Sequence, residues 1–262
     1  MTLFETLSPE EQSQIDRLCG QWELLLTTES QPSLDNLLLQ IRQPVPRRAL
    51  LVELLLTQLD HLAQHSSLVE ETIPEPSDFL LPFLDRAYQA HPELSQHHDV
   101  FTPLVARAFH WSQHQQPHPR VSDYVARFNS LQGVELAIRR GLAEDWPVYL
   151  HIEHRDLSFQ MPIVYPVVVG RQREADSRPI SVVDLAGQEH QVFVAPRSER
   201  RVSRKHLRFE VVSRYRIQVT NTSQRSEALI DNDEKLHGGE TIARNCPVKI
   251  RIFGCELCLD KI

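Results

Sequence analysis

Apolar residues recur every three to four positions through the first 145 residues, and this spacing predicts α-helices. In residues 10–26 the apolar side chains that share one helical face are Ile15, Leu18, Cys19, Trp22, Leu25 and Leu26. Ser8 and Glu11 precede them with the spacing of a capping box, in which each residue satisfies a backbone N–H of the other. We therefore expect a first helix directly after Ser8.

The same period continues further along the chain. A second, short helix is expected to open at Ser33 and to end before Pro44 and Pro46, since proline breaks a helix interior. A third helix is expected over Arg47–Gln64, because its leucines form a wide apolar face that must be buried. A second helical block is expected from about Phe79 to Gly141.

Two segments of the helical region share one pattern. QPSLDNLLLQI (31–41) and HPRVSDYVARF (118–128) align without gaps, and a tryptophan precedes each of them, Trp22 and Trp111. The similarity predicts a duplicated helical unit. The expected boundaries are residues 1–66 for the first unit and 79–145 for the second. The acidic, proline-bearing residues 67–78 between them are expected to form a linker.

After Trp146-Pro147 the period changes from helical to alternating. Short β-branched or alternating runs separated by polar turns are typical of strands in an all-β sandwich or barrel. The runs are VYLHIEH, IVYPVVVG, ISVVDL, QVFVA, HLRFEVV, YRIQVT, VKIRIF and CELCLDKI. The predicted fold class is therefore a duplicated α-helical N-terminal region followed by an all-β sandwich over residues 147–262.

The distribution of charge along the chain indicates which kind of partner it could bind. The chain has 28 Lys and Arg against 35 Asp and Glu, a net charge of −7, but residues 163–262 hold 17 against 13, a net of +4. That leaves 11 against 22, a net of −11, for residues 1–162. A net of +4 is too small for nucleic acid, which requires a strong cationic stripe. It suits a partner that carries a few negative charges, such as one phosphate group.

Location is expected to be cytoplasmic. The chain has no run of about 18 apolar residues that could span a membrane, and its first residues lack the pattern of a signal peptide. Four cysteines, three of them near the C-terminus, do not form a disulfide framework. We therefore expect a reducing environment and no membrane partner.

The basic stretch RRVSRKHLRF (200–209) has two interpretations. Ser203 follows two arginines, as in the substrates of basophilic kinases, so it could accept a phosphate. Alternatively, its hydroxyl and the neighbouring guanidinium groups could bind a phosphate that a partner carries, because such donors hold a phosphate dianion well. Gly170-Arg171 ends an earlier strand-like run, and Asn221-Thr222-Ser223 ends a later one.

These three motifs, in this order, resemble the forkhead-associated (FHA) domain, whose pattern is Gly-Arg, then Ser-x-x-His, then Asp/Asn-x-Ser. The resemblance covers about residues 147–262. It implies an FHA-like sandwich in which Arg171 and Ser203 contact the phosphate, Arg201 faces it, and Arg204 lies at the phosphate or the adjacent peptide backbone. His206 would hold Ser203 in place from within the loop.

The third motif departs from the family. After Ser223 the family has Thr-Asn-Gly, whose asparagine holds the peptide backbone, whereas this chain has Gln224-Arg225-Ser226. The resemblance implies that Gln224 and Arg225 contact the peptide here, and that Gly170, Asn221 and Ser223 support the site. An additional hairpin is expected around Leu185-Ala186-Gly187-Gln188, in the long segment between Arg171 and Ser203.

The helical half has a resemblance of its own. Trp22-Glu23, Pro32–Leu38 and the leucine-rich 47–62 segment are similar to the region before the catalytic domain of planctomycete serine/threonine kinases. No Gly-rich loop, His-Arg-Asp or Asp-Phe-Gly motif follows in this chain. The resemblances together imply a non-catalytic adaptor that binds a phosphothreonine-containing protein or peptide, such as a Ser/Thr kinase or its substrate. The alternative is a structural or regulatory module that has lost phosphate binding and uses its β faces or helical surface.

Metal and cofactor sites are not expected. Cys255 and Cys258 have the spacing of half a zinc site, with Cys246 and His237 nearby, but no second such pair exists. Cysteines on strands near the end of a sandwich are more simply small apolar core residues. The sequence also contains no Gly-x-Ser-x-Gly or P-loop motif. We therefore predict no catalytic residue, no metal and no cofactor.

Overall fold

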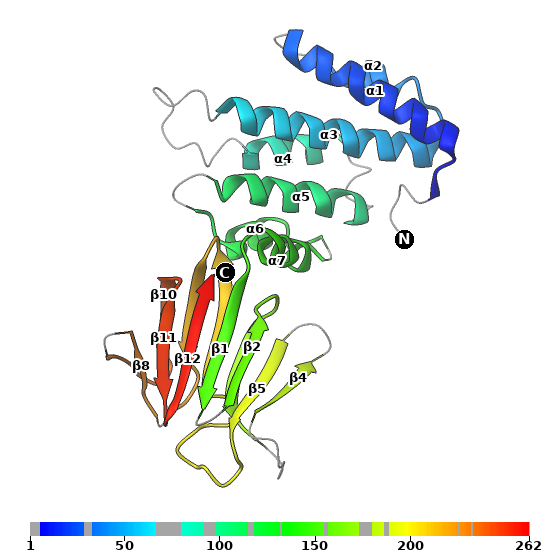
Figure 1. The fold of residues 1–262 in the computed structure, drawn as a ribbon. Coiled ribbons are helices and arrows are strands. Elements are labelled where there is room, and N and C mark those ends of the chain that lie inside the picture. Colours follow the sequence, from blue (N-terminus) through cyan, green and yellow to red (C-terminus); the bar gives the residue numbers. More distant parts are fainter. Residues whose placement is uncertain are drawn as a thin grey trace. The chain divides into compact units, whose positions relative to one another are not determined.

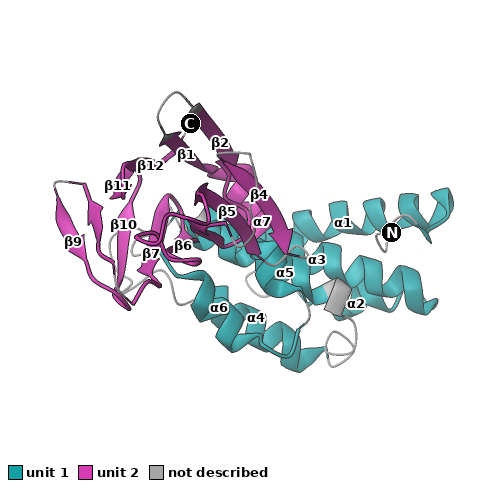
Figure 2. Cartoon of the chain, turned by 90° about the horizontal axis from the view of Figure 1, so that it is seen from below, with its two compact units in different colours: residues 1–138 teal, residues 139–262 magenta. Residues whose placement is uncertain are grey.

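The chain divides into two compact units, with the division between Ile138 and Arg139 (Figure 2). The computed structural model describes residues 6–28, 33–66, 80–91, 98–114, 118–131, 133–154, 157–172, 180–185, 189–224, 226–231 and 233–261. The predicted linker 67–78 lies outside these ranges. The predicted boundaries of two separate helical units, 1–66 and 79–145, stay a prediction.

The first part of the chain is helical, as the 3.6-residue period predicts (Figure 1). Its elements are α1 (Pro9–Thr28), α2 (Asp35–Leu38), α3 (Pro44–Ser66), α4 (Leu80–Ala90), α5 (His98–Ser112), α6 (Val121–Arg127) and α7 (Val134–Asp145). The capping box before α1 is formed, because the Ser8 N–H donates to Glu11 Oε2 at 2.8 Å and the Glu11 N–H to Ser8 Oγ at 3.3 Å.

The prediction for the two prolines was wrong in one respect. Pro44 and Pro46 do not merely end the preceding helix, because α3 begins at Pro44. Proline is well tolerated in the first turn of a helix, where its missing N–H has no intrahelical acceptor. The second helix is correspondingly short, only Asp35–Leu38.

Helix α3 is the common partner of both tryptophans in the helical repeat. The Trp22 indole N–H, from α1, donates to the Leu54 carbonyl at 2.9 Å in the buried core. Trp111, from α5, donates to Asp60, which also accepts two hydrogen bonds from Arg107 at 2.9 and 3.1 Å. Both tryptophans therefore stabilise the packing of their helices against α3, one through a backbone acceptor and the other through a carboxylate.

Two six-stranded sheets follow, and they confirm the predicted fold class of a helical region before a β-sandwich. The strands are β1 (Val148–His154), β2 (Leu157–Pro162), β3 (Val167–Arg171), β4 (Ser181–Leu185), β5 (Glu189–Ala195), β6 (Leu207–Ser213), β7 (Arg216–Asn221), β8 (Ala228–Ile230), β9 (Glu234–Leu236), β10 (Thr241–Asn245), β11 (Val248–Ile252) and β12 (Cys255–Lys261). The additional hairpin exists as the antiparallel pair β4–β5, although residues 186–188 at its turn lie outside the described ranges.

One sheet has the strand order β2-β1-β12-β11-β8-β9, and Figure 1 shows β11, β12, β1 and β2 side by side. The other has the order β10-β7-β6-β3-β5-β4 and is mixed, because β3 pairs with β5 in parallel. Alternate residues of β7, β11 and β12 are buried, as expected where two inner faces form one core. Cross-strand neighbours in these inner rows are Ile152, Leu257, Ile250 and Ile230 in the first sheet, and Val167, Phe209 and Val219 in the second.

Candidate functional site

The loop 203–206 is fixed to the end of β3 by backbone hydrogen bonds. The Arg171 N–H donates to the Ser203 carbonyl at 3.0 Å, and the His206 N–H donates to the Val169 carbonyl at 2.8 Å. Gly170 allows this close approach, since a Cβ atom there would lie 2.0 Å from the Arg204 carbonyl oxygen. The Gly-Arg motif and the Ser-x-x-His motif therefore meet in space, although about thirty residues separate them.

The third motif joins the same cluster. Asn221 is fully buried, its Nδ2 donates to the Ser226 and Leu236 carbonyls at 2.8 Å each, and its Oδ1 accepts from the Ser223 N–H at 2.9 Å. The hydroxyl of Ser223 lies 2.7 Å from that of Ser203. The side chain of Asn221 thus fixes the turn that holds Ser223 against Ser203.

His206 lies behind Ser203 in the core. Its Nδ1 accepts a hydrogen bond from the Ser203 N–H at 3.3 Å, and its Nε2 has no hydrogen-bond partner among the described residues. Burial lowers the pKa of His206 to about 4, because the charged imidazolium loses its hydration there. The ring is therefore neutral at physiological pH, as its role as an acceptor requires. This position fits support of the loop and not proton transfer.

The predicted phosphate-contacting cations differ in their surroundings. Arg171 donates from Nη1 to the Arg197 carbonyl at 2.7 Å, while its Nε is buried and has no partner within the described ranges. Arg204 is exposed, and its backbone carbonyl accepts a hydrogen bond from Gln191 at 3.4 Å. Gln224 is exposed next to the cluster, and Arg225 lies outside the described residues.

Arg201 has its backbone in the cluster and its side chain elsewhere. Its carbonyl accepts a hydrogen bond from the Ser226 hydroxyl at 2.8 Å. Its guanidinium forms a bidentate ion pair with Glu199, at 2.8 Å for both contacts, and lies 3.6 Å from the centre of the Phe253 ring. The sequence motifs do not identify Glu199 or Phe253, since neither belongs to the pattern. The one signal in that part of the sequence is the Phe253-Gly254 pair, which is a candidate turn because glycine is common in turns.

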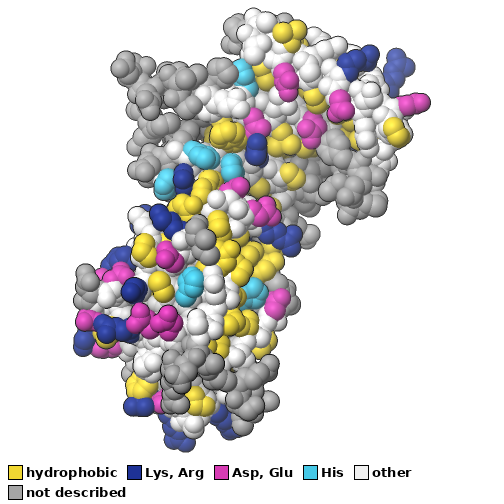
Figure 3. All heavy atoms as spheres, viewed as in Figure 1, with side chains coloured by type: hydrophobic (Ala, Val, Ile, Leu, Met, Phe, Trp, Pro, Cys, Tyr) yellow, Lys and Arg dark blue, Asp and Glu magenta, His cyan; other side chains and the backbone are white. Residues whose placement is uncertain are grey.

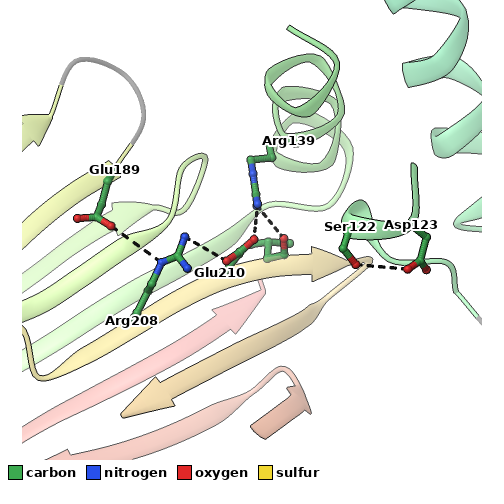
Figure 4. Close-up of polar contacts among 7 residues, drawn as sticks. Ser122, Asp123, Arg139, Glu189, Arg208 and Glu210 are labelled. Atoms are coloured by element: carbon green, nitrogen blue, oxygen red, sulfur yellow. Dashed lines mark hydrogen bonds and ion pairs between the residues drawn. The ribbon is translucent and has the colours of Figure 1, made fainter. Parts of the chain in front are cut away.

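Lys205 connects the loop to a row of alternating charges. It pairs with Glu189 at 3.5 Å, and Arg208 bridges Glu189 at 3.9 Å and Glu210 at 3.4 Å. Figure 4 shows the row continuing to Arg139, which contacts Glu210 and donates to the Val211 carbonyl at 3.1 Å. Each cation in this row already has an acidic neighbour, so the row supplies fixed geometry and little net positive charge.

Acidic and basic side chains are interspersed on the face of the β unit seen in Figure 3. Ion pairs within the β unit include Arg244–Glu234 at 2.7 Å and Lys235–Glu227 at 3.0 Å. Such a mixture does not produce the strong local potential that a polyanion requires. The arrangement agrees with a partner that carries one or two charged groups.

Two of the cysteines, Cys246 and Cys255, are buried in the core. Burial raises the pKa of Cys246 and of Cys255 to about 12, so both thiols stay protonated at neutral pH. Within the described part of the chain, no three His, Cys, Asp or Glu side chains gather in a way that could hold a metal ion. Among the described residues, no helix is long and apolar enough to cross a membrane.

Comparisons with known proteins give matches among solved structures. No family model matches the chain, and no curated protein matches it. Among solved structures, one entitled "Rv0020c_FHA Structure" is similar at a TM-score of 0.29 and 12% sequence identity. The match covers 44% of this chain and 93% of that one.

Proposed function

We propose that this chain is a non-catalytic adaptor that binds a phosphothreonine-containing protein or peptide, in Ser/Thr kinase signalling, through the loops around Ser203. The observation that carries the proposal is the convergence of three separate loops at Ser203. The Ser203 hydroxyl lies 2.7 Å from the Ser223 hydroxyl, and the Ser203 carbonyl accepts a hydrogen bond from the Arg171 N–H. Hydroxyl and guanidinium groups on loops that rigid strands hold in place are suitable donors to a phosphate dianion.

Two further observations support binding of phosphate over its acceptance. The Ser203 hydroxyl is engaged with Ser223, and its backbone N–H is tied to His206, so the residue is held in a folded loop. A kinase substrate usually needs an extended, adaptable segment, which this loop is not. The buried Nε of Arg171, without a partner in the described residues, adds a donor close to the same loop.

A phosphothreonine peptide library bound to the full chain tests the proposal, with the same peptides unphosphorylated as the control. Arg171→Ala should weaken phosphopeptide binding about tenfold or more, because a charge-assisted hydrogen bond is worth roughly 1.5–3 kcal/mol. Ser203→Ala should cost less, since a neutral hydroxyl is the weaker donor. Arg244→Ala is a matched control, because it removes the same charge from β10, opposite Ile217 and away from Asn221.

Affinity should also fall as the pH drops through about 6, where the phosphate loses its second charge. His206 does not contribute to this change, because its pKa is about 4. Isothermal titration calorimetry measures both effects. Equal affinity for phosphorylated and unphosphorylated peptides, or no effect of Arg171→Ala, would contradict phosphate recognition.

The alternative function is partner binding through a β surface without phosphate. The observation that favours it is the edge strand β4, where Val182, Val183 and Leu185 are 40%, 43% and 41% exposed. Exposed apolar side chains on an edge strand are suited to pairing with another extended segment. If the partner binds along β4, Val183→Lys should abolish binding of that partner, whereas Arg171→Ala should leave its binding unchanged.

A further inference from the structure

Arg201 carries a guanidinium whose hydrogen-bonding edge is already occupied by an acid of the same loop. Its Nε and Nη2 donate to the two oxygens of Glu199, at 2.8 Å each, and the Arg201 N–H donates to Glu199 Oε1 at 3.1 Å. The Glu199 N–H in turn donates to the Pro196 carbonyl at 3.0 Å, which fixes the turn that carries the carboxylate. Glu199 is thereby positioned for Arg201.

The planar face of the Arg201 guanidinium lies against an aromatic ring. Phe253 lies 3.6 Å from it, at the turn between β11 and β12, and remains 42% exposed. Phe253 and Gly254 both have positive φ, 48° and 75°, so the tight turn fixes the position of the ring. Arg201, Glu199 and Phe253 line a cavity of about 440 Å³.

Glu199 and a phosphate would use the same donors. A planar guanidinium presents its Nε and Nη2 donors as a fork, and carboxylates and phosphates bind that fork in the same bidentate way. The backbone of Arg201 is part of the candidate phosphate site, since its carbonyl accepts from Ser226 and it lies two residues before Ser203. An occupied fork is therefore withheld from any phosphate bound beside Ser203.

We propose that Glu199 is a built-in competitor for Arg201, which lowers the affinity of the Ser203 site for a phosphorylated partner. The proposal rests on the proposed function. Because Glu199 already neutralises Arg201, binding depends on Arg171, Arg204 and the Ser203 hydroxyl. The strongly lowered pKa of Glu199, about 2 because of its hydrogen bonds from Arg201, agrees with a carboxylate that stays charged at every physiological pH.

Removing the negative charge of Glu199 tests this proposal. Glu199→Gln should bind a phosphothreonine peptide about two- to fivefold more tightly in calorimetry at 0.15 M salt, the range expected for one exposed ion pair. Arg201→Gln should reduce affinity more in the Glu199→Gln background than in the wild type. Glu234→Gln, which frees Arg244 on β10, removes the same charge away from the site and should leave affinity unchanged.

The outcomes separate this proposal from the proposed function. Binding that depends on Arg171 but is unchanged by Glu199→Gln overturns the competitor and leaves phosphate recognition standing. The same gain in Glu234→Gln as in Glu199→Gln, or equal effects of Arg201→Gln in both backgrounds, also overturns it. If neither the wild type nor Glu199→Gln binds phosphopeptides, both proposals fail. Binding by Glu199→Gln alone supports the competitor in its strongest form.

Discussion

Gly170→Ala is the substitution for which the structure gives the sharpest expectation. An added methyl group at this position would lie 2.0 Å from the Arg204 carbonyl oxygen and 3.0 Å from that of Ser203. Both obstacles are backbone atoms, so no side chain can rotate away. The loop 203–206 must therefore move by about 1 Å or more from β3 to restore ordinary van der Waals contact.

That movement stretches the two hydrogen bonds that flank the clash. The bonds join Arg171 N–H to the Ser203 carbonyl at 3.0 Å and His206 N–H to the Val169 carbonyl at 2.8 Å. Each is worth about 1 kcal/mol net, and the strain of an overpacked site costs about 1–3 kcal/mol more. We expect the free energy of unfolding of the β unit to fall by roughly 3–5 kcal/mol.

Hydrogen exchange in increasing urea is the appropriate assay, since a chain with two units need not unfold in a single transition. Peptides that cover β6 and β7 report on the β unit directly. Gly20→Ala is the matched control, because no atom lies within 4 Å of its new methyl group. Alanine is also the better helix former, so this variant should be stabilised by up to about 1 kcal/mol in α1.

Unchanged protection of β6 and β7 in Gly170→Ala would refute the reasoning, because it would mean that the loop yields at no cost. The same variant should also bind phosphopeptides less well, since Ser203 moves with the loop. A loss of binding without any loss of protection would place the effect of Gly170 on the ligand and not on the loop.

Two further predictions concern buried polar groups in the two units. The pKa of His206 is lowered from 6.5 to about 4, so the unfolded chain binds a proton that the folded chain does not. The free energy of unfolding of the β unit should therefore fall as the pH drops from about 6.5 to about 4. His206→Asn should flatten that decline when both proteins are unfolded in urea. Parallel pH profiles of the two proteins would contradict this expectation. Trp22→Phe removes the buried hydrogen bond to the Leu54 carbonyl and part of the indole volume. We expect a loss of about 1–3 kcal/mol in the helical unit, measured by circular dichroism in urea, and an unshifted midpoint would show that α3 does not depend on this contact.

The amino-acid sequence by itself determined the class of each half of the chain. The helical period up to residue 145 and the alternating period after Trp146-Pro147 report which faces must be buried, and burial is the dominant contribution to folding. The sequence also determined α1, since the capping box of Ser8 and Glu11 is a local interaction. Four strands, β2, β8, β9 and β10, were not predicted; β8 and β9 have only three residues each, which is too few to show a period.

Tertiary structure decided where side chains go when several partners compete. Pro44 begins α3, where its missing N–H costs nothing in the first helical turn, so the proline alone did not tell a helix start from a helix end. Both tryptophans bond to α3, an assignment that depends on packing across the helical unit. The order of the three motifs along the sequence did predict that Arg171, Ser203 and Ser223 belong to one site, because each motif lies at the end or the beginning of a strand.

The surroundings of Arg201 could not be deduced in the same way. The sequence pattern predicts a cation that faces the phosphate, whereas the folded chain offers it Glu199 two residues earlier and Phe253 about fifty residues later. A guanidinium on a flexible stem binds whichever anion and ring the fold brings within reach, and the β11–β12 turn brings the ring. Strand positions follow from local period, but the partner of a long charged side chain depends on distant loops that only the assembled sandwich places.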